Sequence, residues 1–308
     1  MVKFLYDVPV LLKHKKVPGW QYLYKFNKLV LNKCYPVLHK KDKHSGIDEK
    51  GKIIVSLTSF PARIDLVWIT ITSMMNQTLK PKKIILWLSN EQYKDETQLP
   101  QSLLKLKERG LEICFCEDLK PHKKYFYTMQ QYPEDVIVTV DDDIFYPENH
   151  LEMLWKKHLE YPKDVCCWFA HKLAYDKNGK ISRYKEWQSG ISGCTEPTYQ
   201  IMAVGCGGVL YPPHCLSKKV FRLEDIKELC PVTDDLWLKA MEVEAGTKVV
   251  RCTEKSQVFY GFLETRKTGL FTENANKNGN DEAIHAIMTR YPQISEKLYS
   301  DYKGNEMH

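Results

Sequence analysis

The sequence predicts an α/β fold, with an open and mainly parallel β-sheet flanked by helices. From residue 52 onward, apolar runs of strand length alternate with segments whose apolar residues recur at helical spacing. Strands separated by helices form βαβ units, in which the strands of the sheet run parallel. The chain has 308 residues and is 43% hydrophobic, so it can bury one substantial core. These observations exclude a disordered chain and favour one large domain.

The first half of the predicted domain holds four strands and the three helices that connect them. The strands are predicted at 53–57, 83–88, 111–116 and 135–140, and the helices at 65–77, 101–109 and 124–132. Gly110 directly follows the second helix, where glycine favours a helix end. The regular alternation predicts that these strands form the parallel part of the sheet.

The second half has a less regular pattern. It is predicted to contain a helix at 148–161 and a hairpin of 166–175 and 180–187 that turns at Asn-Gly. A second helix is predicted at 234–245 and a last strand at 248–252. Gly246 is predicted to end the second helix. Residues 188–232 are rich in glycine, proline and cysteine, which is typical of a region that lines a substrate.

Residues 1–50 form a basic and aromatic appendage before the domain at 51–308. They hold eleven lysines and four acidic residues, a net charge of +7, which leaves −1 of the total +6 for the remainder. One interpretation is attachment to an anionic membrane surface, where each lysine contributes about 1 kcal/mol. The other is a solvated N-terminal helix that packs on the domain. No apolar run reaches the roughly 18 residues of a membrane span, and the stretch 4–12 fits a secretory signal poorly.

Cysteine usage favours a reducing compartment. The ten cysteines contain no C-x-x-C pair and no ladder of the kind that disulfide scaffolds show. We therefore expect reduced, mostly buried thiols. The expected location is the cytoplasm, with peripheral attachment to the inner face of the plasma membrane if the basic N-terminus binds lipid.

An acidic triplet, Asp141-Asp142-Asp143, follows the continuous apolar strand at 135–140. In open α/β sheets, ligands bind beyond the carboxyl ends of the strands, which is where this triplet falls. Adjacent carboxylates repel unless water or a cation compensates their charge. Mg²⁺ or Mn²⁺, held by one or two carboxylates and by substrate phosphates, meets that requirement. The alternative is that the aspartates only cap the helix entered near Pro147.

A strand ending in Asp-x-Asp resembles the signature of glycosyltransferases with the GT-A fold. The segment 140–147, Val-Asp-Asp-Asp-Ile-Phe-Tyr-Pro, resembles bacterial family-2-like members that build surface polysaccharides. The resemblance covers residues 52–290 and implies a nucleotide diphosphate sugar donor, with UDP as the family expectation. It implies that Asp143 binds the metal and that Asp141 contacts the donor ribose or the metal. Asp142 would lie in the donor site, or be only structural.

Two further segments resemble parts of the family's donor site. In the first strand and its loop, Thr58, Ser59 and Arg63 would contact the base or a phosphate; the alternative is a polar turn that caps the next helix. The loop has no Gly-x-Gly-x-x-Gly, which disfavours dinucleotide binding. The basic turn at 116–124 is the second segment.

A departing nucleoside diphosphate needs its growing negative charge stabilised, and lysines at a helix N-terminus combine formal charge with the helix dipole. Related sequences have a similar basic turn before the acidic strand. The resemblance therefore favours Lys123 and Lys124 as phosphate contacts and Asp118 as a contact of the base. The alternative is a solvated basic turn.

A second acidic site, Asp234-Asp235, opens the helix predicted at 234–245. Direct displacement of a sugar needs a base that takes the proton of the attacking hydroxyl. The family commonly supplies it from an acidic pair at a helix start, which implies Asp235 as the base and Asp234 as second choice. The alternative is that Thr233 and the acids cap the helix. The resemblance also places the glycines at 205–208 below the transferred sugar, and 266–280 is predicted to be a loop that closes over the donor.

The resemblance thus implies a metal-dependent, inverting glycosyltransferase of surface glycan synthesis, with a nucleotide-binding half at 51–147 and an acceptor-binding half at 148–308. Its acceptor would be a glycan or lipid-linked glycan. The alternatives are a catalytically inactive sugar- or nucleotide-sugar-binding protein, and a metal-dependent phosphoryl-transfer enzyme. Phosphoryl transfer through an aspartate expects Asp-x-Asp-x-Thr, and Phe145 stands where the threonine would be. Nucleic-acid binding is disfavoured, because no basic and aromatic patch continues into the domain.

Overall fold

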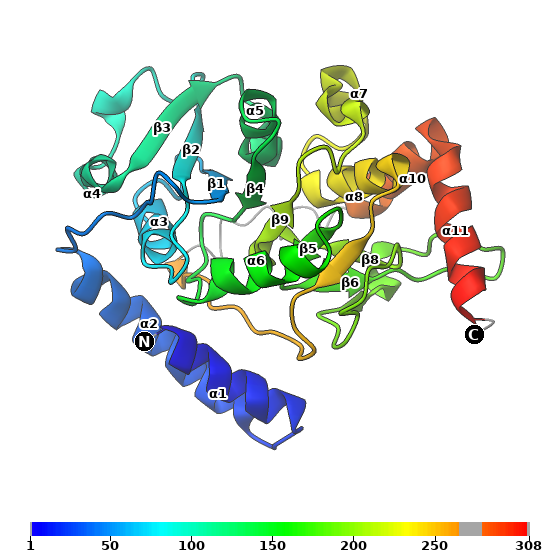
Figure 1. The fold of residues 1–308 in the computed structure, drawn as a ribbon, viewed down its shortest axis with the longest axis horizontal. Coiled ribbons are helices and arrows are strands. Elements are labelled where there is room, and N and C mark those ends of the chain that lie inside the picture. Colours follow the sequence, from blue (N-terminus) through cyan, green and yellow to red (C-terminus); the bar gives the residue numbers. More distant parts are fainter. Residues whose placement is uncertain (1, 265–278, 307–308) are drawn as a thin grey trace.

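A computed structural model gives the fold of the chain and describes residues 2–264 and 279–306 (Figure 1). A seven-stranded sheet runs through its centre in the order β10-β5-β9-β4-β1-β2-β3. The strands are β1 (Ile53–Thr58), β2 (Lys83–Ser89), β3 (Leu111–Cys116), β4 (Val136–Thr139), β5 (Val165–Cys167), β9 (Val209–Tyr211) and β10 (Val249–Arg251). Neighbouring strands are parallel except where β9 is involved. This open, mainly parallel sheet confirms the predicted GT-A-like fold class.

Helices cover both faces of the sheet, because its central strands are apolar on both sides. The α-helices are α1 (Val2–His14), α2 (Trp20–His39), α3 (Val67–Met75), α4 (Gln101–Leu104), α5 (Lys123–Gln131), α6 (His150–Glu160), α7 (Leu223–Leu229), α8 (Asp234–Ala245), α10 (Gly279–Arg290) and α11 (Pro292–Glu306). Ile54 of β1 packs on the face where α5 lies, and its neighbour Val55 packs on the face of α3. The alternation places consecutive side chains in two separate cores.

The order of the strands creates a switch point between β1 and β4. From β1 the chain moves outward through β2 to β3, and it then returns to place β4 on the other side of β1. The register pairs Ser56 with Thr139, so β1 and β4 end side by side. Ligands of open α/β sheets bind at such a point, beyond the carboxyl ends of the strands. The acidic triplet directly follows β4 and therefore lies there.

The predicted hairpin at 166–175 and 180–187 is wrong in its second strand. The turn is present, with Gly179 at φ 78°, but only an isolated bridge joins Tyr175 to Ile181. Trp187 is buried and donates its indole N–H to the carbonyl of Ser182 at 3.0 Å, which folds the segment back on itself. A small antiparallel sheet forms instead, in the order β7-β6-β8, from β6 (Ala170–Lys172), β7 (Gln188–Ser189) and β8 (Ile201–Ala203).

Most other predicted elements are present with shifted ends. The helix predicted at 101–109 is α4 followed by a 3-10 helix at Lys105–Arg109, which ends at Gly110 with φ 103°. The side chain of Arg109 is buried and donates to the carbonyl of His44 at 3.0 Å. The last predicted helix is α8, with the expected bounds and with Gly246 at φ 85° after its end. Positive φ is the backbone geometry that glycine supplies at a helix end.

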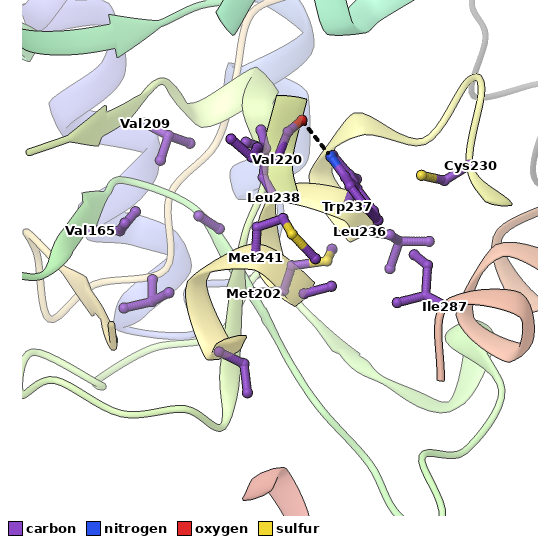
Figure 2. Close-up of a cluster of buried hydrophobic side chains, with 14 of the residues drawn as sticks. Val165, Met202, Val209, Val220, Cys230, Leu236, Trp237, Leu238, Met241 and Ile287 are labelled. Atoms are coloured by element: carbon purple, nitrogen blue, oxygen red, sulfur yellow. Dashed lines mark hydrogen bonds between the residues drawn. The ribbon is translucent and has the colours of Figure 1, made fainter. Parts of the chain in front are cut away.

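A buried apolar cluster fixes α8 in the fold (Figure 2). Trp237 is fully buried there, among side chains that include Met241 and Ile287, and its indole N–H donates to the carbonyl of Val220 at 3.0 Å. Trp187 and Trp237 are both core residues, so neither presents a ring face on which a sugar could stack. The cluster sets the position of the N-terminus of α8, where the second acidic site lies.

The N-terminal appendage consists of α1 and α2, which lie together along one side of the domain (Figure 1). Tyr6 and Leu31 are buried in a cluster with Phe145 and Tyr260. The hydroxyl of Tyr6 donates to the carbonyl of Phe145 at 2.6 Å and accepts from the backbone N–H of Tyr260 at 3.0 Å. The helices therefore do pack on the domain, as one interpretation of the sequence expects.

Two sequence expectations concern compartment and anchoring. All ten cysteines lie in the described part of the chain and none is in a disulfide there; five of them are buried. Over residues 2–264 and 279–306, no helix combines the length and the apolar character that crossing a bilayer requires.

Candidate active site

A cavity of about 480 Å³ opens beyond the carboxyl ends of β1 and β4, and both acidic sites contribute to its wall. From the predicted donor side, the residues that line it include Thr58, Arg63, Lys124, Asp141, Asp142 and Asp143. Asp234 and Asp235 line it from the start of α8, almost a hundred positions further along the chain. Two motifs that are distant in sequence are thus brought into one site.

Asp142 is the buried member of the triplet. Its carboxylate accepts hydrogen bonds from the hydroxyl of Ser59 and from Nη1 of Arg63, both at 2.6 Å. Burial raises the pKa of the Asp142 carboxyl, while the Arg63 charge and these two hydrogen bonds lower it. Asp142 therefore ties the loop after β1 to the end of β4. The interpretation of Asp142 as a structural residue accounts for all of these contacts.

Arg63 joins two members of the triplet. In addition to its bond with Asp142, its Nη2 lies 3.2 Å from Oδ2 of Asp143. Its guanidinium lies over the ring of Phe60, 5.4 Å from the centroid. Arg63 therefore compensates the negative charge of two aspartates and is held by an aromatic ring as well.

Lys124 connects the acidic triplet to the second acidic site across the cavity. Its Nζ lies 2.9 Å from Oδ1 of Asp141 and 2.8 Å from Oδ2 of Asp234, and its side chain is only 5% exposed. Burial alone would lower its pKa, but the charges of Asp141, Asp234 and Asp235 raise it well above the usual value. Lys124 is therefore a permanently charged ammonium between the two acidic sites. A solvated basic turn is not what this residue forms.

Asp235 is half-buried at the cavity wall, and its carboxylate accepts the backbone N–H of Gly205 at 3.1 and 3.2 Å. Burial, with the Asp234 charge next, raises the pKa of the Asp235 carboxyl from 3.8 to about 8. A carboxylate with a raised pKa is a stronger base than an ordinary aspartate. Its position and its pKa both suit proton transfer.

Gly205 lies against the centre of this charged cluster. A Cβ placed on it would meet Nζ of Lys124 at 2.6 Å, Oδ1 of Asp141 at 3.1 Å and Oδ1 of Asp235 at 3.2 Å. The backbone conformation itself does not require glycine, because its φ is not positive. The close approach of charged side chains is therefore the reason that glycine fits here.

The carboxylates of the two acidic sites do not cap helices, contrary to the alternative interpretation. Thr233 is the N-cap residue of α8, but its side chain makes no capping hydrogen bond, and no partner for its hydroxyl exists among the described residues. Asp234 is directed to Lys124, and Asp235 to the N–H of Gly205. After the triplet, α6 begins only at His150, with Asn149 as its N-cap.

Three of the predicted donor-site residues do not belong to the cavity wall formed by the described residues: Ser59, Asp118 and Lys123. Ser59 supports Asp142, as above. Lys123 is buried and pairs with Asp118, which also pairs with Lys120 at 2.9 Å. Thr58 lines the cavity, but its hydroxyl donates to the carbonyl of Trp87 at 2.8 Å. Contacts of Asp118 and Lys123 with a nucleotide stay predictions.

Several aromatic residues of the cavity were missed by sequence reasoning. The wall includes Phe60, Phe169, His171 and Tyr184, of which the last three belong to or flank the small sheet. Burial lowers the pKa of His171, which keeps it neutral. The predicted substrate-lining region 188–232 does contribute, through residues such as Ser189, Met202 and Cys206. No periodic signal distinguishes these aromatic residues from core residues, and the pairing of the small sheet is what brings Phe169, His171 and Tyr184 to the cavity.

Asp141 and Asp143 are the residues that would hold a divalent metal. Their side chains are 32% and 20% exposed at the cavity, whereas that of Asp142 is only 6% exposed and both of its oxygens accept hydrogen bonds. Within the described ranges, no group of three or more His, Cys, Asp or Glu side chains is arranged to hold a metal ion. Two carboxylates completed by substrate phosphates and water are the donor set that Mg²⁺ usually has. The residues present fit a metal that arrives with its substrate.

The predicted closing loop at 266–280 lies almost entirely outside the described residues. Of this range, Gly279 and Asn280 begin α10, and Asn280 lines the cavity.

Among the comparisons with known proteins, the one with solved structures gives matches. No known protein family and no curated protein matches the sequence. Solved structures do match the fold, and among them is the crystal structure of S. aureus TarS 1-349 in complex with UDP. The TM-score is 0.44 and the identity 15%, over 69% of this chain and 60% of that chain. This chain therefore spans less than two thirds of the length of that structure.

Proposed function

We propose that this chain is a metal-dependent glycosyltransferase that moves a sugar from a nucleoside diphosphate, with inversion, to a hydroxyl of a glycan or lipid-linked glycan in surface glycan synthesis. One observation carries the proposal. A single cavity at the switch point of the sheet holds Asp141 and Asp143 after β4 and Asp235 at the start of α8, and Lys124 bridges the two sides. A donor and an acceptor need such an arrangement in order to meet.

On the acceptor side, Asp235 would act as the base. Its carboxylate takes the proton of the acceptor hydroxyl while that oxygen attacks the anomeric carbon, and the bond to the diphosphate oxygen breaks on the opposite side. The N–H of Gly205 holds the carboxylate in place. Asp234 pairs with Lys124 at 2.8 Å, which leaves Asp235 as the better base of the two.

On the donor side, Mn²⁺ or Mg²⁺ on Asp143 and Asp141 would neutralise charge on the departing diphosphate. Lys124 lines the same cavity, and an ammonium has three N–H donors. Asp141 accepts one of them at 2.9 Å and Asp234 lies within ion-pair distance at 2.8 Å, and we propose that another N–H is directed to a diphosphate oxygen. Arg63 holds Asp142 and Asp143 in position for the donor.

The test compares Asp143→Asn and Asp235→Asn with wild type in transfer and in donor binding. Asp143→Asn is expected to lose manganese-dependent donor binding and turnover. Asp235→Asn is expected to keep donor binding and to lose at least 100-fold in kcat, the usual contribution of a general base. A matched control is Asp135→Asn, near the opposite end of β4, whose carboxylate pairs with Lys82 at the surface.

Full transfer by Asp143→Asn in manganese, or by Asp235→Asn with normal donor binding, would refute the respective assignment. Donor binding without transfer or hydrolysis by wild type identifies the inactive binding protein instead. Release of phosphate from a phosphomonoester would identify phosphoryl transfer.

A further inference from the structure

The outer face of the two N-terminal helices is apolar and exposed. Among the described residues, ten large hydrophobic side chains are exposed, and eight of them lie between Phe4 and Leu38. On α2, Tyr22 is 77% exposed, Phe26 62% and Val37 75%. Isolated exposed apolar residues are common on protein surfaces, but a concentration of this kind on one element marks an interaction surface.

Helical geometry places these residues on one line. Each residue of an α-helix advances by about 100°, so Tyr22, Phe26, Leu29 and Val37 fall within an arc of about 80°. The buried residues Leu31 and Tyr35 fall on the opposite side of α2. α2 is therefore apolar on two opposite faces, and packing on the domain uses only one of them.

The first helix repeats this arrangement. Its buried residues include Val2 and Tyr6, whereas Phe4 and Leu11 are exposed and lie about opposite to them around the axis. We define the N-terminal apolar face as Phe4, Leu11, Tyr22, Phe26, Leu29 and Val37. All six side chains are turned away from the domain.

The charge around this face has one sign. Residues 2–40 hold eight lysines and a single acidic residue, Asp7. Lys33 lies within the apolar arc of α2, and Lys25 beside it; both are exposed, as is Lys15 just after α1. Apolar residues with interleaved lysines are the composition of helices that lie in the headgroup region of an anionic bilayer.

A second copy of the same face fits less well. Symmetric contact would bring two sets of these lysines together, and like charges across an interface oppose association. An anionic lipid surface compensates the lysines and covers the apolar side chains at the same time. Aromatic residues such as Tyr22 and Phe26 are also favoured at the level of the headgroups.

We propose that the N-terminal apolar face docks on an anionic membrane surface, with α1 and α2 lying in the plane of the interface. The buried face of α1 contacts the loop that follows the acidic triplet, since the hydroxyl of Tyr6 donates a hydrogen bond to the carbonyl of Phe145. Docking would thus hold the cavity at a fixed distance from the lipid. The membrane binding itself does not rest on the proposed function.

The test is sedimentation of the full chain with sucrose-loaded vesicles of phosphatidylcholine, alone or with phosphatidylglycerol. Binding is expected with the anionic vesicles, weaker binding with the neutral ones, and release in high salt. The Phe26→Glu/Val37→Glu variant is expected to lose binding. Leu159→Glu is the matched control, because Leu159 is 64% exposed on α6, outside this face.

Charge is tested separately with Lys25→Gln/Lys33→Gln, which should partition about 25-fold less onto anionic vesicles, since each surface lysine contributes roughly fivefold. Its control is Lys177→Gln/Lys185→Gln, on exposed positions elsewhere. Circular dichroism shows whether each variant is folded. Equal vesicle binding by the apolar variant and Leu159→Glu would overturn the proposal. The proposal would also be overturned if the wild-type chain formed a dimer that does not bind vesicles and that the Phe26→Glu/Val37→Glu substitutions dissociate.

Discussion

At the scale of single residues, the site is organised around one buried cation. Lys124 lies within bonding distance of Asp141 and Asp234, and it acts on Asp235 through its charge. Removing one partner of a buried ion pair leaves an uncompensated charge, which is why such clusters tolerate little change. Two predictions follow from this geometry, one for Asp235 and one for Gly205.

The pH dependence of transfer should report Asp235. A base acts in its deprotonated form, so kcat/KM is expected to rise with pH through an apparent pKa near 8, the value to which burial and the Asp234 charge raise this carboxyl. In Asp234→Asn one of these causes is removed, and the rising limb should move to lower pH. The measurement is kcat/KM from pH 5.5 to 9.5 for both proteins. A rising limb that is unchanged in Asp234→Asn would contradict the assignment.

Gly205→Ala should impair activity far more than stability. The added methyl meets Nζ of Lys124 at 2.6 Å and both neighbouring carboxylates near 3 Å, so the lysine or Asp235 must move. We expect at least a tenfold loss of kcat, because small displacements of catalytic groups are costly. Gly304→Ala is the control, since a Cβ there has open space. Normal kcat in Gly205→Ala would show that the cluster adapts without consequence.

At the scale of elements, α8 links the hydrophobic core to the second acidic site. Asp234 and Asp235 lie in its first turn, and the next two residues, Leu236 and Trp237, are buried in the cluster of Figure 2. The start of α8 therefore cannot move without disturbing this packing. Lys124 holds the same helix from the side of α5.

Trp237→Phe should reduce both stability and activity. The substitution leaves the carbonyl of Val220 without its indole donor and opens space in a packed core. We expect a loss of about 1–3 kcal/mol in the free energy of unfolding, measured by urea titration. Because α8 carries both acids, kcat should fall as well. Trp155→Phe on α6, where the indole is only half-buried, is expected to change both quantities less.

At the scale of the whole molecule, two halves of one sheet and an N-terminal helical pair meet at the acidic triplet. The backbone of Asp143 and Phe145 pairs with Tyr260 and Phe262, and the same segment contacts α1 and α2. The loop that would hold the metal is thus braced by three distant parts of the chain. Ligand binding at this loop should stabilise the whole fold.

Thermal unfolding in a panel of nucleotide sugars should show this coupling. A ligand at 100 times its Kd adds about 2.7 kcal/mol to the free energy of unfolding of a protein that binds it only when folded. We expect the cognate nucleotide sugar to raise Tm by several degrees with Mn²⁺, and much less with EDTA. In Asp143→Asn, Mn²⁺ should make no difference. An equal increase in Tm with EDTA and with Mn²⁺ would argue against a metal.

Local sequence patterns were enough to predict the alternation of strands and helices, because buried central strands must be continuously apolar and connecting helices must show their own period. It also placed both acidic sites, since each stands at a boundary between elements. The hairpin predicted at 166–187 has its turn but lacks its second strand, because the segment after the turn folds back on the buried Trp187. No local sequence signal predicts that Asp142 is buried while its two neighbours in the triplet are partly exposed.

The contacts of the charged residues, in contrast, depend on how distant parts of the chain pack together. Lys123 and Lys124 are adjacent and alike in sequence, yet one pairs with Asp118 and the other joins two acidic sites from different parts of the chain. Gly205 is required by the side chains that approach it and not by its own backbone. Local sequence determines which elements form, since propensity and period act over a few residues. The site depends on contacts between segments that only the order of strands in the sheet brings together.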